Sequence, residues 1–156
     1  MGWSEGEDLG KLIAGSEKLA EIFGYWPSFH DAEVFEISLW RGDVEPARQS
    51  YVFPVLTAKI HLWELTEEIN DKGFYTLRHH TMATLRFHDV SELHLTGFNH
   101  QNAIFGLAIV REERTEGASP VLTVKFEEAF GVKAEFICMR IEVVEAVACD
   151  AKGRAE

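Results

Sequence analysis

The stretch Leu56-Thr57-Ala58-Lys59-Ile60-His61-Leu62-Trp63 decides the fold class, because apolar and polar side chains alternate along it. Strict alternation is typical of a strand with one face on a core and the other in water. It predicts that Leu56, Ala58, Ile60 and Leu62 face inward and that Thr57, Lys59, His61 and Trp63 face outward. The same period predicts strands at 33–40 and 81–87, with the inward residues Phe35, Ile37, Leu39, Ala83, Leu85 and Phe87. Similar patterns predict further strands at 92–95, 103–111, 121–126 and 132–144.

About seven strands without intervening helix-length segments exclude a βαβ fold. We therefore predict a mainly β chain, α+β by count of elements, built as an antiparallel sandwich or open barrel. An N-terminal amphipathic helix is expected to cover one face or edge. Ser4 and Glu7 have capping-box spacing, Ser16 is a second start signal, and Gly24 ends the pattern, so one broken helix or two short ones fit.

We expect a single domain over residues 1–156. Its helical start covers about 4–24, its β-rich part 32–147, and a frayed tail 148–156. The chain has no apolar run long enough for a membrane span, and its first residues lack the layout of a signal peptide. With two cysteines in no paired pattern, we expect a cytoplasmic protein with reduced thiols.

The net charge of the chain limits the classes of partner that we expect it to bind. The chain has 26 acidic residues against 15 Lys and Arg, for a net charge of −11. A protein this acidic is repelled by nucleic-acid phosphates and by anionic lipid, so we expect neither a nucleic acid nor a membrane as partner. A basic partner would be attracted, although acidity that serves only solubility explains the composition equally well.

Catalytic chemistry has little support in the motifs. Histidine is plentiful at seven residues, and Phe-His-Asp occurs at 29–31 and again at 87–89. A metal site would combine His30, Asp31 and Glu33, but neighbouring residues on a strand point to opposite faces. No HExxH spacing, nucleophile elbow or phosphate-binding glycine loop is present. We predict no catalytic residues, metal or cofactor, and keep an enzyme that uses these three residues as an alternative.

Two segments have the composition of binding loops. Residues 23–31 hold several aromatics and a proline, and residues 96–102 hold amides and a histidine. Rigid aromatics and adaptable amides are typical of interfaces, whereas a buried aromatic plug and amide-bonded turns are the structural alternative. The partner-binding residues predicted from these segments are Trp26, Phe29, His30, Asp31, Glu33, Asn99, His100 and Asn102.

The segment 22–34, Ile-Phe-Gly-Tyr-Trp-Pro-Ser-Phe-His-Asp-Ala-Glu-Val, resembles the most recognisable stretch of the immunity protein 50 family of bacterial polymorphic-toxin systems. The segment 95–102 also resembles that family, and the similarity runs from about Ser16 to Val144. The resemblance implies a cytosolic, non-enzymatic protein that binds and neutralises a cognate toxin. It assigns no catalytic residues and no contact surface.

The net charge of −11 makes a basic toxin the hypothesis for that partner. A homo-oligomeric scaffold, pairing through the aromatic segment or an open strand edge, is the second alternative to the immunity role.

Overall fold

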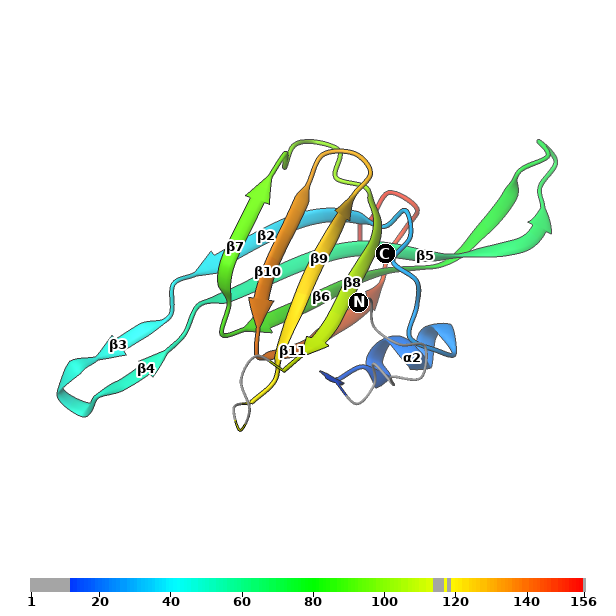
Figure 1. The fold of residues 1–156 in the computed structure, drawn as a ribbon. Coiled ribbons are helices and arrows are strands. Elements are labelled where there is room, and N and C mark those ends of the chain that lie inside the picture. The colour runs from blue at the N-terminus through cyan, green and yellow to red at the C-terminus, as the bar shows by residue number, and fades with distance from the viewer. Residues whose placement is uncertain (1–11, 114–116, 118, 156) are drawn as a thin grey trace.

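The computed structural model describes residues 12–113, 117 and 119–155, and it folds these into two sheets packed face to face (Figure 1). One sheet has the strand order β1 (Ile13–Ala14), β11 (Arg140–Ala148), β6 (Tyr75–His88), β5 (Val55–Ile69) and β2 (Glu33–Trp40). The other has the order β7 (Ser91–Thr96), β10 (Lys133–Cys138), β9 (Val121–Glu128) and β8 (Ile104–Glu112). The two sheets are open and do not close into a barrel. Of the two predicted architectures, the sandwich is therefore confirmed.

Two hairpins project from opposite ends of this sandwich (Figure 1). The β3–β4 arm consists of β3 (Asp43–Glu45), the 3-10 turn η1 (Pro46–Arg48) and β4 (Ser50–Val52). The β5–β6 arm, residues 64–78, is the continuation of β5 and β6 beyond the rest of their sheet. The sequence patterns predicted neither projection.

The core lies between the sheets and contains the inward residues predicted for β5 and β6. Leu56, Ala58, Ile60, Leu62, Ala83, Leu85 and Phe87 are all buried, as predicted. At the centre, Phe87 packs edge-on against Phe136 of the opposite sheet, with ring centroids 5.1 Å apart. Phe126 completes the cluster at 6.0 Å from Phe136. These aromatic contacts join the two sheets directly.

The predicted core face of β2 is wrong for Phe35, and Leu39 is exposed although it lies on the predicted face. The register of β2 against β5 shifts between Val34 and Glu36, which marks a β-bulge. A bulge moves side chains to the other face of a strand. Val34, opposite the buried Ile60, is therefore buried, and Phe35 at the bulge is exposed. Ile37 and Leu39 lie opposite Ala58 and Leu56 and so share the core side, but Ile37 is only partly buried and Leu39, near the end of β2, is exposed.

The single strand predicted at 132–144 is also wrong, because the structure contains two strands in different sheets. β10 ends at Cys138, β11 begins at Arg140, and Met139 forms the corner, its backbone N–H donating to the His88 carbonyl at 2.9 Å. Apolar side chains continue through this corner without glycine or proline, so the pattern gives no sign of a break.

The predicted start signal at Ser4 and Glu7 lies outside the described residues. The predicted helical start is wrong at Ile13–Ala14, which form β1 and pair in parallel with β11. The second start is confirmed: α2 (Glu17–Phe23) follows Ser16 and ends at Gly24, whose φ of +87° is left-handed. Leu19 and Phe23 are buried, and α2 packs against β11 and β6 (Figure 1). Among the described residues, none of the helices has the length and apolar composition needed to cross a bilayer.

The tail does not fray as expected but turns back over the five-stranded sheet. Asp150 Oδ1 accepts hydrogen bonds from the backbone N–H groups of Lys152 and Arg154 at 2.8 and 2.9 Å. Gly153 lies so close to Phe35 and His61 that an added Cβ would lie 2.5 Å from the Phe35 ring. His61, predicted to face water, is consequently buried and hydrogen-bonds His80 at 3.0 Å.

The core aromatic cluster gives a stability prediction. Phe136→Ala removes a fully buried ring and should lower the free energy of unfolding by about 3–5 kcal/mol. Phe130→Ala, at an exposed ring, is the matched control and should change it by less than about 0.5 kcal/mol. Urea unfolding followed by circular dichroism measures both, and equal losses would contradict the assigned core.

His61 gives a pH prediction. Burial and the neighbouring His80 lower the pKa of His61 below its ordinary value of 6.5, against the opposing effect of Asp150. The unfolded chain therefore binds a proton there more readily, and the free energy of unfolding falls as pH drops below about 6.5. His61→Gln should flatten this fall, whereas His94→Gln, at an exposed histidine, should keep it. Urea midpoints from pH 8 to 5 provide the test, and parallel curves for all three proteins would refute it.

Candidate functional site

The segment between α2 and β2 is fixed at one side and exposed at the other. Phe29 is buried and packs against Trp26 with ring centroids 5.6 Å apart. The backbone N–H of Asp31 donates to the Ile104 carbonyl at 2.8 Å, and the N–H of Ala32 donates to the Phe29 carbonyl at 3.0 Å. With these anchors inside, the side chains of His30 and Asp31 point outward.

His30 is held in place by its neighbours on β8. Its Nδ1 donates to the Phe105 carbonyl at 2.9 Å, and its ring stacks over the exposed ring of Phe105. Its Nε2 lies 3.5 Å from Asp31 Oδ2. Asp31 adopts a left-handed φ of +66°, a conformation that Asp tolerates better than most residues. The pair therefore forms a fixed polar corner on the surface.

The segment 97–102 is tied to the first segment through Asn102, which is buried. Its side-chain amide donates to the carbonyls of Val34 at 3.2 Å and Asn99 at 2.7 Å, and its Oδ1 accepts from the Asn99 N–H at 2.9 Å. The Glu33 carboxylate accepts from the Asn102 backbone N–H. Glu33, Asn99 and Asn102 thus hold the two predicted loops together, while His100 is exposed.

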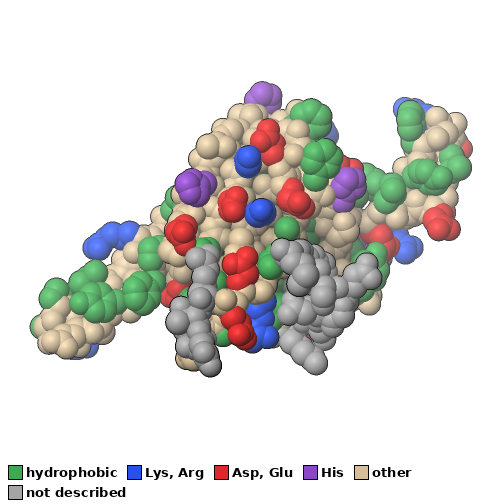
Figure 2. Space-filling model, in the orientation of Figure 1, with side chains coloured by type: hydrophobic (Ala, Val, Ile, Leu, Met, Phe, Trp, Pro, Cys, Tyr) green, Lys and Arg blue, Asp and Glu red, His purple; other side chains and the backbone are tan. Residues whose placement is uncertain are grey.

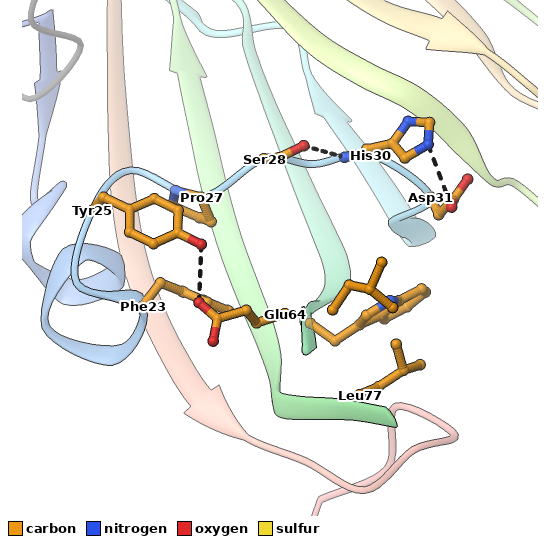
Figure 3. A pocket seen from close by; sticks show the side chains of 10 residues that line it. Phe23, Tyr25, Pro27, Ser28, His30, Asp31, Glu64 and Leu77 are labelled. Atoms are coloured by element: carbon orange, nitrogen blue, oxygen red, sulfur yellow. Dashed lines mark hydrogen bonds and ion pairs between the residues drawn. The ribbon is translucent and has the colours of Figure 1, made fainter. Parts of the chain in front are cut away.

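A groove of about 440 Å³ opens beside His30 and Asp31, at the base of the β5–β6 arm (Figure 3). Its lining residues come from α2, the segment after it, β5 and β6: Phe23, Tyr25, Pro27, Ser28, His30, Asp31, Trp63, Glu64, Leu65 and Leu77. Apolar side chains make up most of this wall, with a few polar groups at the rim. Such a lining suits an apolar side chain flanked by hydrogen-bonding groups.

Glu64 ties the groove to the arm. The Tyr25 hydroxyl donates to Glu64 Oε2 at 2.9 Å (Figure 3), and Arg78 Nε donates to Glu64 Oε1 at 2.6 Å. The bond from Arg78, followed by the bond from Tyr25, holds the pKa of Glu64 below its ordinary value. The bond to Glu64 raises the pKa of Tyr25. Both contacts are therefore made by an ionised carboxylate.

Seven of the eight predicted residues fall in three places, and His100 lies apart from these as an exposed side chain. His30 and Asp31 line the groove; Trp26 and Phe29 line a neighbouring hollow of about 360 Å³ that reaches β8. Glu33, Asn99 and Asn102 lie in the hydrogen-bond network between the loops. The sequence reasoning missed the arm side of the groove, at Trp63, Glu64, Leu65 and Leu77. Asn70-Asp71-Lys72-Gly73 between two β-type runs is the hairpin signal from which this arm could have been located.

The geometry does not assemble His30, Asp31 and Glu33 around one point, because Glu33 is bonded to Asn102. Within residues 12–113, 117 and 119–155, no three His, Cys, Asp or Glu side chains are grouped to hold a metal ion. Both cysteines are buried thiols rather than members of a disulfide. Burial raises the pKa of Cys138 to about 12, so this thiol packs the core as a protonated, unreactive group.

The structure is a β-sandwich with an open groove beside a surface loop that backbone hydrogen bonds hold in place. The chain belongs to the immunity protein 50 family, whose model matches residues 15–148. The family predicted from residues 22–34 and 95–102 is thereby confirmed. No curated protein and no solved structure matches the chain.

Asn102 gives a prediction about the loop network. Asn102→Ala leaves two carbonyls and one N–H without their bonds and should cost about 1–3 kcal/mol of unfolding free energy. His100→Ala, two residues away and exposed, should stay within about 0.5 kcal/mol of wild type. Chemical denaturation measures the free energy of unfolding of both variants. If Asn102→Ala is as stable as wild type, the hydrogen-bond network does not hold the loops.

Proposed function

We propose that this protein binds a cognate toxin and neutralises it by covering the toxin surface, without catalysing a reaction. Membership of the immunity protein 50 family carries the proposal. The site geometry supports it, because the segment 22–34 lies directly on an open groove lined by apolar side chains (Figure 3). Grooves of this kind accept anchor side chains of a partner.

The proposed contact uses the predicted residues in two roles. His30 and Asp31 meet the toxin from the rim of the groove, and His100 adds an exposed side chain of the second loop. Trp26, Phe29, Glu33, Asn99 and Asn102 fix the loops in the binding conformation. Fixing loops before binding lowers the entropy lost on association.

The proposed toxin is basic, and the complex forms in the cytoplasm of the bacterium that produces it. The net charge of −11 supports a basic partner. Acidic side chains are distributed over the face of the four-stranded sheet (Figure 2). Glu127 of β9 and Glu135 of β10 line one hollow of this sheet. Complementary charge accelerates encounter, and salt screens this acceleration.

The test pairs this protein with the toxin domain encoded beside its gene. Cells that express the toxin domain should grow only when this protein is co-expressed, and the purified proteins should form a stoichiometric complex. Toxicity that persists with this protein at high level, together with the absence of a complex, would overturn the proposal.

The same pair tests the charge argument. The association rate constant should fall by about 10-fold or more between 50 and 500 mM NaCl, while the dissociation rate constant changes less. Surface plasmon resonance measures both rate constants. An association rate that does not respond to salt would contradict a basic toxin while leaving the binding role intact.

A further inference from the structure

We propose that the β5–β6 arm and the groove at its base form one docking surface, which receives an apolar patch of the toxin rimmed by Lys and Arg. This inference rests on the proposed function and adds the location of the interface. Four observations carry it: the exposed apolar side chains of the arm, the area that they expose, the hydrogen bonds that order the arm, and its net charge.

Apolar side chains are exposed along the whole arm (Figure 2). Their exposed fractions lie between 44% and 68%, for Leu65, Ile69, Phe74, Tyr75 and Leu77. An isolated two-stranded ribbon buries little surface of its own and is marginally stable in water. Large apolar patches on a protein surface mark interaction sites. The composition of the arm therefore favours coverage by a partner.

The area approaches what a stable complex needs. At roughly 150–200 Å² for a large side chain, these five expose about 500 Å² in total. A standard protein–protein interface buries about 800 Å² on each partner. The groove continues this surface, since Leu65 and Leu77 line it together with Tyr25, which is also exposed. Arm and groove together approach the size of one such interface.

Hydrogen bonds order the arm at its tip, in its middle and at its base. At its tip, Asn70 Oδ1 accepts hydrogen bonds from the N–H groups of Lys72 at 2.9 Å and Phe74 at 3.1 Å. In the middle, the Thr66 hydroxyl donates to the Thr76 carbonyl at 3.0 Å. At its base, Glu64 bonds Arg78 across the strands. A ribbon ordered before binding loses little entropy when a partner covers it.

The charge of the β5–β6 arm indicates the chemistry of its partner and distinguishes this arm from the β3–β4 arm. Residues 64–78 contain four carboxylates against two cations, Lys72 and Arg78, so the rim of the apolar patch is negative. The β3–β4 arm, with its flanking residues, balances Asp43 and Glu45 with Arg41 and Arg48. It projects from the end of the sandwich opposite the β5–β6 arm (Figure 1). Both arms expose apolar side chains, and a second groove of about 460 Å³ lies at the base of the β3–β4 arm. Between the two arms, the β5–β6 arm is the one that adds excess negative charge and a groove lined by His30 and Asp31.

The deciding experiment compares matched aromatic pairs on the two arms. Phe74 and Tyr75 are 68% and 56% exposed, and Tyr51 and Phe53 are 59% and 57% exposed. The double variant Phe74→Ser/Tyr75→Ser should raise the Kd for the toxin domain encoded beside the gene by about 100-fold or more. Tyr51→Ser/Phe53→Ser should change it less than about 3-fold. Calorimetry measures Kd, and circular dichroism verifies that both variants fold.

The outcomes separate the two proposals. If wild type binds the toxin domain and the Phe74/Tyr75 variant binds equally well, the docking surface is wrong and the proposed function stands. If the Tyr51/Phe53 variant alone loses affinity, the interface belongs to the β3–β4 arm and this inference is overturned. A wild-type protein that binds no toxin overturns the proposed function and the inference with it.

A second pair of variants tests the charged rim without touching the apolar patch. Glu67→Gln/Glu68→Gln should lower the association rate constant several-fold at low salt, whereas Asp43→Asn/Glu45→Gln should leave it near the wild-type value. A larger decrease in the association rate constant for the Asp43/Glu45 variant than for the Glu67/Glu68 variant would overturn the assignment of the charged rim to the β5–β6 arm. Light scattering of the free protein tests whether a second copy of this chain occupies the arm instead of the toxin. A dimer of the wild type that the Phe74/Tyr75 substitutions dissociate would show that it does, and would overturn the inference.

Discussion

The antiparallel pairing of β5 with β6 is the contact on which the rest of the structure depends. It runs from Val55 opposite His88 at one end to Ile69 opposite Tyr75 at the other. Its first part supplies the central ladder of the five-stranded sheet and the inward residues of the core. Its second part leaves the sandwich, after register shifts beyond Leu62 and Leu65, and becomes the arm. One ladder therefore connects the most buried part of the molecule to its most exposed apolar surface.

This continuity explains how a small sandwich extends an apolar hairpin beyond its core. The strands that form the arm are anchored in the core, so the arm needs no packing of its own to keep its direction. Tyr25 and Arg78 both bond Glu64 at the point where the arm leaves the sheet, and this contact aligns the family segment 22–34 with the arm. The second loop is aligned through Asn102. Loop, groove and arm are then positioned before any partner arrives.

Sequence patterns predicted the sandwich, the second helix start at Ser16 and the family, because alternation and a distinctive segment are local signals. They failed where a single residue changes the geometry: the bulge after Val34, the corner at Met139, and the tail turn that buries His61. They predicted His30 and Asp31 as candidate contacts, but the opposite wall of the groove comes from residues more than thirty positions later. Only the strand pairing brings those walls together.

Hydrogen–deuterium exchange on the complex with the toxin domain tests the central claim most directly. Binding through the groove and the β5–β6 arm predicts slower exchange in residues 24–31 and 64–78, with residues 43–53 unchanged. Protection confined to residues 43–53, or to the face of the four-stranded sheet, would contradict this account.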